Sequence, residues 1–147
     1  MQNESEAREE LKRADHSIFV TLKYTKTCDV IKNTIKRLIN AYDYGINHAL
    51  TVLHDKKKLK EIPSTPISRA EMLKKTYRRT EITAFIKFYS LLRRIDRASY
   101  SKKEEFRKNV ALIATLEDGE VINVDIVTLY SYFQKTKEFI DYIEGKF

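Results

Sequence analysis

Apolar residues recur along most of the chain at the three- and four-residue spacings of an α-helix. The longest run extends from Thr27, a predicted N-cap, to about Lys57. Its apolar side consists of Ile31, Ile35, Leu38, Tyr42, Gly45 or Ile46, Ala49 and Leu53. Because residues three and four apart lie on one side of a helix, the run predicts a single long amphipathic helix. Gly45 inside it costs about 1 kcal/mol relative to alanine, which favours a close approach of another helix at this point.

A shorter periodic run precedes the long helix. Its apolar residues are Ala7, Leu11, Ala14 and Ile18. They predict a helix that starts after Asn3 or Ser5 and ends near Tyr24. Glutamates gather near its start, where the positive end of the helix dipole favours them. Residues 17–24, SIFVTLKY, are rich in β-branched and aromatic side chains, so an extended conformation is the alternative there.

Two prolines, Pro63 and Pro66, mark a linker after the long helix. The linker leads into a short helix over residues 67–77, for which either Thr65 or Ser68 can act as the N-cap.

The third long helix opens at Thr80. Its buried face consists of Ile82, Phe85, Ile86, Tyr89, Leu92 and Ile95. A fourth long helix starts near Asp125 and ends at Gly145, a residue type that often terminates helices. Its apolar stripe consists of Ile126, Leu129, Tyr130, Phe133, Ile140 and Ile143.

The period changes between the last two helices. Residues 110–124 contain two short β-rich runs around Asp118 and Gly119, a dipeptide typical of tight hairpin turns. We therefore expect one domain over residues 1–147, mainly all-α: an antiparallel up-and-down four-helix bundle with a short extra helix and a small β-hairpin near residues 110–124.

The composition agrees with a helical protein. The chain has only 3 glycines and 2 prolines, too few for the many tight turns of a β-sandwich or barrel. No apolar stretch approaches the roughly 20 residues of a membrane-spanning helix, and the first residues lack the apolar core of a secretory signal. We therefore expect a cytoplasmic protein without a membrane partner. The charged fraction of 33% is similar to that of thermophilic proteins.

Positive charge is concentrated in the middle of the chain. Residues 56–108 contain 17 Lys and Arg against 6 Asp and Glu, and the remaining residues contain 11 against 15. Such a segment favours an acidic partner. Six of its cations are candidate contacts to the phosphates of a nucleic acid: Arg93, Arg94, Arg97, Lys102, Lys103 and Arg107. Guanidinium groups can bind phosphate with two hydrogen bonds. The alternative is that the arginines only complement the dipole at a helix C-terminus.

Catalytic patterns are absent from the sequence. His16, His48 and His54 include no i,i+4 pair suited to a metal, and there is no glycine-rich phosphate loop. Cys28, the one cysteine, excludes an internal disulfide, and its neighbour Asp29 opposes formation of a thiolate. We expect no cofactor and no metal, and enzymatic activity is not favoured.

Aromatic side chains offer one further kind of contact. The 9 tyrosines and 7 phenylalanines could include a platform on which nucleic-acid bases stack. Most of them lie on the apolar sides of predicted helices and are expected in the core. Tyr24, Tyr77 and Tyr100 lie near predicted helix ends and are free for other contacts.

The order of the segments resembles that of HEPN-domain proteins, small helical bundles that include prokaryotic toxin ribonucleases and partners of minimal nucleotidyltransferases. The resemblance covers roughly residues 5–105. It rests on a long helix, NTIKRLINAYDYGINHAL, a proline-punctuated linker, EIPSTPISRAEML, and an arginine-rich helix end, LLRRIDRASY. The hairpin near residues 110–124 is not a feature that the resemblance implies.

In the ribonuclease members of that family, an arginine is followed by a polar residue, three variable positions, a histidine and, two positions later, often a tyrosine. The resemblance places the arginine at Arg93, the polar residue at Arg94 and the tyrosine at Tyr100, whereas Ala98 occupies the histidine position. Alanine cannot transfer a proton, so the resemblance does not extend to the family's metal-independent RNA cleavage.

Three functions are compatible with these patterns. The first is a non-catalytic HEPN-like bundle, a homodimer, that binds RNA or another polyanion through a basic face. The second is a protein-interaction subunit that docks a separately encoded enzyme such as a minimal nucleotidyltransferase, with the hairpin edge available to a partner chain. The third is a metal-independent ribonuclease with a rearranged site, in which His16 or His48 lies near Arg93.

Overall fold

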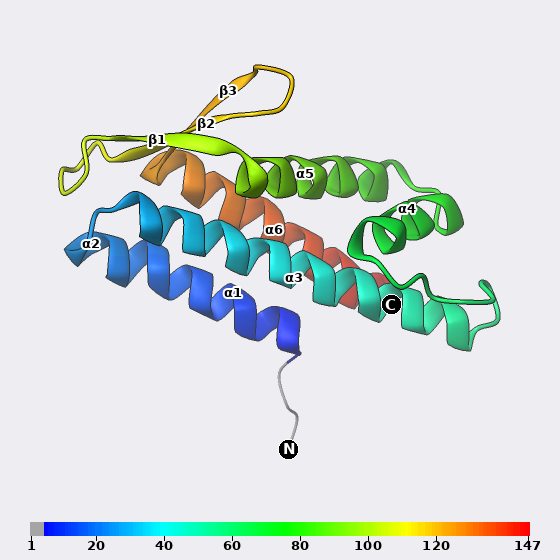
Figure 1. Ribbon diagram of the computed structural model, residues 1–147. Helices are drawn as coiled ribbons and strands as arrows, with labels where there is room; N and C mark the ends of the chain where they lie inside the picture. The colour runs from blue at the N-terminus through cyan, green and yellow to red at the C-terminus, as the bar shows by residue number, and fades with distance from the viewer. Residues whose placement is uncertain (1–4) are drawn as a thin grey trace.

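The computed structural model describes residues 5–147 as a mainly helical chain with one small antiparallel sheet (Figure 1). Its elements in chain order are α1 (Glu6–His16), a π-helical turn η1 (Ser17–Thr21), α2 (Leu22–Tyr24), α3 (Cys28–Asp55), α4 (Pro66–Thr76), α5 (Thr80–Arg97), β1 (Ser99–Lys103), β2 (Ala111–Thr115), β3 (Val121–Asp125) and α6 (Ile126–Lys146). The segment 17–24 is helical, which excludes the extended alternative.

Side-chain caps fix where the helices begin. Four residues each accept a hydrogen bond from the backbone N–H three positions later: Ser5, Thr27, Thr65 and Asp125. Thr65 rather than Ser68 therefore caps α4, and the alternative start at Asn3 lies outside the described residues. The last helix continues through Gly145 to Lys146, so the prediction that Gly145 ends it is wrong by one residue.

The long helices α1, α3, α5 and α6 run alternately in opposite directions along one axis (Figure 1). Helix α3 is central and contacts α1, α4, α5 and α6. Among residues 5–147, none of the helices combines the length and the apolar character that crossing a membrane requires.

The predicted close approach at Gly45 is present in the contact between α3 and α6. A Cβ atom at Gly45 would lie 2.8 Å from Cε2 of Phe139 and 3.0 Å from Cδ1 of Ile140. The Phe139 ring stacks on Tyr42 with centroids 4.5 Å apart and meets Phe85 edge-on at 5.3 Å. Glycine thus allows a buried aromatic ring to lie against the backbone of α3.

The sheet differs from the expected hairpin. β2 and β3 form the predicted antiparallel pair, with Gly119 in the left-handed region (φ 88°) at the turn. A third strand, β1, pairs with β2 on its other side and gives the order β1-β2-β3. This third strand, over residues 99–103, was not predicted from the sequence.

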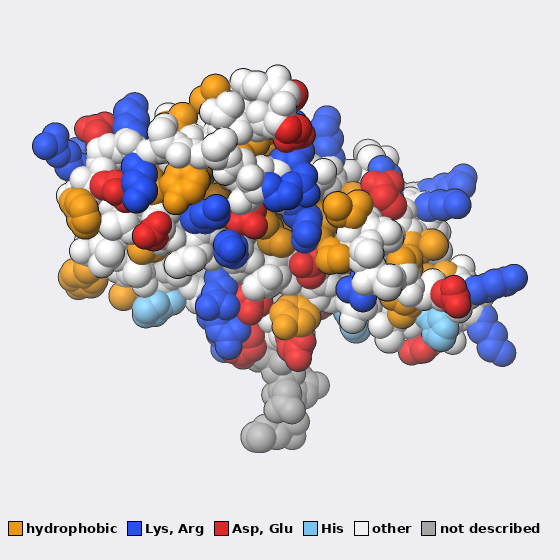
Figure 2. All heavy atoms as spheres, viewed as in Figure 1, with side chains coloured by type: hydrophobic (Ala, Val, Ile, Leu, Met, Phe, Trp, Pro, Cys, Tyr) orange, Lys and Arg blue, Asp and Glu red, His pale blue; other side chains and the backbone are white. Residues whose placement is uncertain are grey.

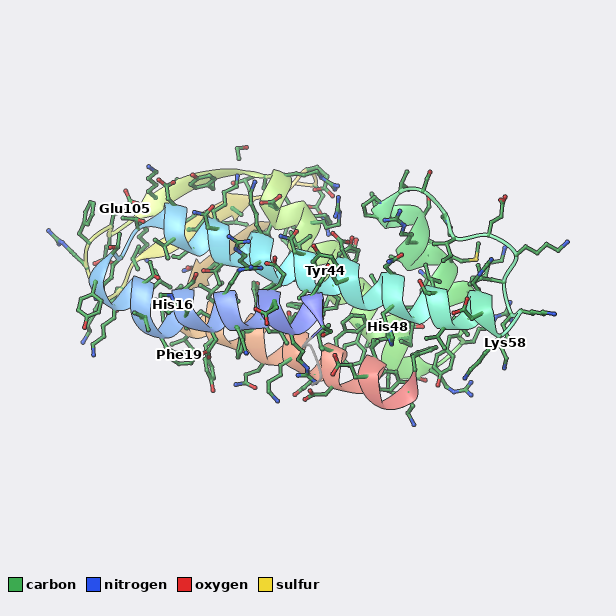
Figure 3. All side chains as sticks on the ribbon, turned by 90° about the horizontal axis from the view of Figure 1, so that it is seen from below. His16, Phe19, Tyr44, His48, Lys58 and Glu105 are labelled. Carbon is green, nitrogen blue, oxygen red and sulfur yellow. The ribbon has the colours of Figure 1, made fainter. Side chains whose placement is uncertain are left out.

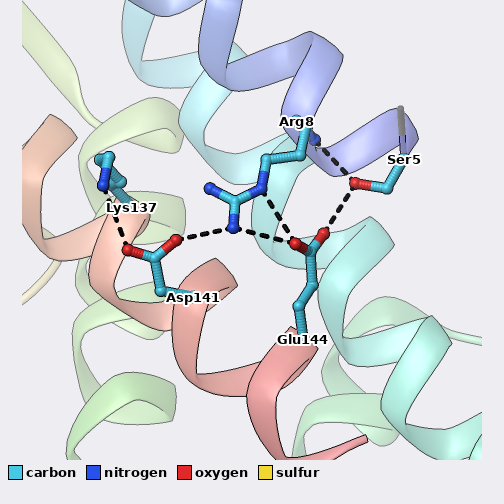
Figure 4. Close-up of polar contacts among 5 residues, drawn as sticks. All are labelled: Ser5, Arg8, Lys137, Asp141 and Glu144. Atoms are coloured by element: carbon cyan, nitrogen blue, oxygen red, sulfur yellow. Dashed lines mark hydrogen bonds and ion pairs between the residues drawn. The ribbon is translucent and has the colours of Figure 1, made fainter. Parts of the chain in front are cut away.

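An ion-pair cluster joins the start of α1 to the end of α6 (Figure 4). The Arg8 guanidinium lies 2.6 Å from Oδ1 of Asp141 and 2.9 Å from Oε1 of Glu144. Glu144 also accepts a hydrogen bond from the Ser5 hydroxyl, and Lys137 lies 3.1 Å from Asp141. One arginine therefore neutralises two carboxylates that belong to the opposite helix.

Candidate nucleic-acid interface

The six predicted phosphate contacts lie in the last turns of α5, in β1 and in the β1–β2 loop. Ala98 follows the last residue of α5 in an extended conformation (φ −72°, ψ 151°), so the chain passes directly from helix to strand. Side chains alternate along a strand, which places Tyr100 and Lys102 on one face of β1 and Lys103 on the other. The Tyr100 side chain packs against the core, whereas both lysines are exposed.

Arg93 points toward α3 rather than into solvent. Its Nη1 donates a hydrogen bond to the Tyr89 hydroxyl at 3.1 Å and lies 3.7 Å from Oδ2 of Asp43. The Tyr89 hydroxyl in turn donates to Asp43. Burial raises the pKa of Asp43, and the Tyr89 hydrogen bond and the Arg93 charge oppose this shift only in part. The Arg93 guanidinium therefore makes its hydrogen bond and its ion pair within the fold, although its Nε has no hydrogen-bond partner among the described residues.

Arg94 fastens α5 to the β2–β3 turn. Its Nε lies 2.6 Å from Oε1 of Glu117, and its Nη2 lies 3.1 Å from Oδ2 of Asp118. The pKa of Asp118 is lowered, chiefly by the hydrogen bond from the backbone N–H of Glu120 and further by Arg94. Two carboxylates therefore already neutralise this arginine.

The other four predicted cations remain available to a partner. Arg97, Lys103 and Arg107 are exposed, and none of them forms an ion pair with another residue in the part of the chain that the structure describes. Lys102 has only a long contact, 3.9 Å between its Nζ and Oε1 of Glu105. Exposed pairs of this length contribute little to stability, so Lys102 can exchange Glu105 for another anion.

Helix α3 adds two cations that sequence analysis did not single out. The Lys32 ammonium lies 5.1 Å from the centre of the Tyr100 ring, which brings α3 against β1. Lys36 is exposed one helical turn later on the same side. We define the basic face as the surface around β1 that carries Lys32, Lys36, Arg97, Lys102, Lys103 and Arg107, with Lys103 on the side of the strand opposite to Lys102. Figure 2 shows Lys and Arg side chains over this part of α3, α5 and β1.

Other positive charges of residues 56–108 lie far from this face. Lys56, Lys57 and Lys58 follow the C-terminal end of α3, and Figure 3 shows Lys58 and Glu105 at opposite ends of the molecule. The excess of positive charge in residues 56–108 is therefore not gathered in one place on the molecule.

The β1–β2 loop is held tightly beside the basic face. The Glu105 carboxylate accepts a hydrogen bond from the backbone N–H of Cys28 at 2.9 Å, at the N-terminus of α3. The N–H of Phe106 donates to the carbonyl of Lys26 at 2.6 Å. Glu104 (φ 49°) and Phe106 (φ 68°) adopt the left-handed conformation. Such residues cost roughly 1–3 kcal/mol each, so the surrounding contacts must enforce this shape.

The ribonuclease alternative requires a histidine near Arg93. A cavity of about 70 Å³ lies beside Arg93 and Arg97, and no histidine from residues 5–147 lines it. His48 lies instead in a groove of about 790 Å³ between α1, α3 and α6. Burial raises the pKa of the Cys28 thiol, whose Sγ donates to the carbonyl of Ala111 at 3.2 Å. No group of three or more potential metal ligands occurs in the described chain.

Comparisons of the sequence with protein-family models and with curated proteins, and of the fold with solved structures, find no match. The site must therefore be interpreted from its own geometry.

Asp43 and Asp141 should make the free energy of unfolding depend on pH in opposite directions. The pKa of Asp43 lies above its ordinary value of 3.8, so its contribution to the free energy of unfolding is present at low pH and declines as pH rises through the raised pKa. Burial alone would raise the pKa of Asp141, but hydrogen bonds from Arg8 and Lys137 hold it below 3.8. Its contribution is present above 3.8 and declines as pH falls through the lowered pKa.

We therefore expect Asp43→Asn and Asp141→Asn to change the stability profile in opposite directions. Relative to Asp43→Asn, the unmodified protein should gain stability as pH falls through the raised pKa of Asp43 toward its ordinary value of 3.8, by at most about 1.4 kcal/mol per pH unit. Relative to Asp141→Asn, it should lose stability below about pH 4, by a smaller amount because solvent screens that pair. Urea unfolding between about pH 2.5 and 7 measures both, and profiles of the same sign would contradict the assignment.

Proposed function

We propose that this protein is a non-catalytic, HEPN-like helical domain that binds RNA, or a polyanion of similar charge density, through the basic face. The single observation that carries the proposal is the set of exposed cations without carboxylate partners among the described residues: Arg97 at the end of α5, Lys103 at the end of β1 and Arg107 in the β1–β2 loop. Lysines and arginines on such a surface bind phosphates and release condensed counterions, which is the main source of affinity for nucleic acids.

Two features of the fold favour this proposal. Edge strand β1 carries Lys102 and Lys103, and lysines on an edge strand discourage pairing with another chain. This argues against β1 as a docking edge for a separately encoded enzyme. The alternating directions of α1, α3, α5 and α6 support the up-and-down bundle that the proposal includes (Figure 1). The homodimer expected from the HEPN resemblance is also part of the proposal, and sedimentation equilibrium tests it.

The decisive experiment measures the anisotropy of a fluorescein-labelled single-stranded RNA over a range of salt concentrations. A variant that combines Arg97→Ala, Lys103→Ala and Arg107→Ala should bind at least about tenfold more weakly at 50 mM salt. The slope of log affinity against log salt should become shallower by about 2, because each phosphate contact with a single strand contributes about 0.7.

The matched control removes three positive charges at the opposite end of the molecule. A variant that combines Lys56→Ala, Lys57→Ala and Lys58→Ala should retain the slope of the unmodified protein. The proposal fails if the unmodified protein does not bind RNA at about 50 mM salt, or if both triple variants lose affinity equally.

A further inference from the structure

A group of exposed aromatic side chains lies at the end of the molecule that carries the β1–β2 loop. Phe19 is 50%, Tyr24 79%, Phe106 76% and Tyr130 41% exposed. Tyr44 is the one other aromatic side chain in residues 5–147 that is exposed to this degree, and it lies in the middle of α3. We call Phe19, Tyr24, Phe106 and Tyr130 the aromatic tip. Figure 3 shows Phe19 toward the same end of the molecule as Glu105.

The local structure keeps these rings out of the core. In η1, the N–H of Leu22 bonds to the carbonyl of Ser17, a five-residue step that is one turn of a π-helix. Ile18 and Leu22 remain buried, whereas Phe19 lies outside them. Phe19 meets the ring of Tyr130 from α6 edge-on, with centroids 5.4 Å apart. One half of the aromatic tip is thus formed where η1 crosses the first turns of α6.

The second half is attached to the first through the backbone. Tyr24 is the last residue of α2, which follows η1 directly, and the Lys23 ammonium lies 5.9 Å from the centre of its ring. The hydrogen bond from Phe106 to Lys26 holds the β1–β2 loop against the chain that follows Tyr24. The left-handed backbone of Phe106 is part of the shape that leaves its ring in solvent. Strained residues that expose an aromatic ring are unusual in a region that serves only stability.

The aromatic tip is continuous with the basic face. Phe106 lies in sequence between Lys103 and Arg107, and its loop begins where β1 ends. A groove of about 290 Å³ runs from Lys103 and Lys108 to Val127 at the start of α6. A strand of RNA bound along Arg97 and Lys103 would reach Phe106 next, and the cations that flank the rings attract phosphates rather than another basic surface.

We propose that the RNA bound by the basic face is single-stranded and that its bases stack on the aromatic tip. This inference rests on the proposed function. Every base has a π-face, so stacking on exposed rings between cations binds single strands with little sequence preference. In a duplex the bases are already stacked on one another, and their faces cannot reach these rings.

The experiment compares fluorescein-labelled oligouridine of about 12 nucleotides with an RNA duplex of equal length, both titrated with the intact protein. Phe106→Leu and Tyr24→Leu keep an apolar side chain of similar size but remove the ring. Each should weaken binding of the single strand about fivefold or more and leave the salt slope unchanged. Phe106→Tyr and Tyr24→Phe keep the ring and should bind like the unmodified protein. Circular dichroism confirms that each variant is folded.

Val20→Ala is the matched control, because Val20 is 41% exposed next to Phe19 in η1 but has no ring. It should leave RNA affinity unchanged. The inference is overturned if the duplex binds as tightly as the single strand, or if the two leucine variants bind RNA normally. It is equally overturned if Val20→Ala weakens binding as much as they do, or if the leucine variants only abolish self-association or binding to anionic vesicles. Absence of any RNA binding would instead refute the proposed function itself.

Discussion

Replacing Phe139 by alanine is expected to lower the free energy of unfolding by about 3–5 kcal/mol. The ring is fully buried between α3, α5 and α6. Its removal eliminates the stack on Tyr42 and the edge contact with Phe85, and leaves a cavity that the surrounding helices can fill only in part. Urea unfolding followed by circular dichroism measures the loss, and a change below about 1 kcal/mol would show that Phe139 is not central to the core.

The same ring determines the effect of Gly45→Ala. In the unmodified protein the new Cβ would lie 2.8 Å from Phe139, and the overpacking of roughly 1–3 kcal/mol should outweigh the gain of about 1 kcal/mol in helix propensity. In the Phe139→Ala background that contact is gone, and Ile140 can shift its terminal methyl group. Gly45→Ala should then stabilise the protein. An equal effect of Gly45→Ala in both backgrounds would contradict this explanation.

The helices could be predicted because α1, α3, α5 and α6 each have one apolar side and because all of these but α5 have a capping side chain at their start. Even the contact at Gly45 was indicated, since glycine inside a long helix needs a reason. Strand β1 could not be identified in the same way. Its residues, SYSKK, have only one partly buried position, Tyr100, so the alternation that marks a half-buried strand is almost absent. The strand forms because β2 offers it a ladder of hydrogen bonds, which is information from the tertiary structure.

The candidate site was predictable only in part, because contacts between residues far apart in the sequence decide which cations are free. The sequence shows that Arg93, Arg94 and Arg97 lie close together, but not that Asp43 and Glu117 occupy the first two. Those partners lie far away in the sequence. Lys32 and Lys36 were missed because they are ordinary polar positions of an amphipathic helix. Tyr24 was noted as free for other contacts, whereas the exposure of Phe106 depends on a backbone conformation that no sequence signal indicates.

Glu105 holds the β1–β2 loop against α3 and also lies beside Lys102 of the basic face. Its replacement by alanine is the second change that we expect to have a large effect, both on stability and on RNA binding. Loss of its hydrogen bond from the N–H of Cys28 removes a cap from α3, which should cost about 1–2 kcal/mol although Thr27 still accepts a hydrogen bond from Val30 in the same turn. Amide exchange should become faster at Cys28 and through the β1–β2 loop. Glu104→Ala, a neighbouring exposed carboxylate without this contact, should change stability by less than about 0.5 kcal/mol.

The effect of Glu105 on RNA binding separates charge from loop geometry. Glu105→Ala and Glu105→Gln both remove one negative charge beside Lys102, which by electrostatics alone should strengthen binding equally. Glutamine retains an oxygen that can accept the hydrogen bond from Cys28, so only the alanine variant should release the left-handed loop that presents Phe106. We therefore expect Glu105→Gln to bind oligouridine more tightly than Glu105→Ala. If the two variants bind equally, the position of the loop does not contribute to RNA binding, and Phe106 has no role that depends on its strained backbone.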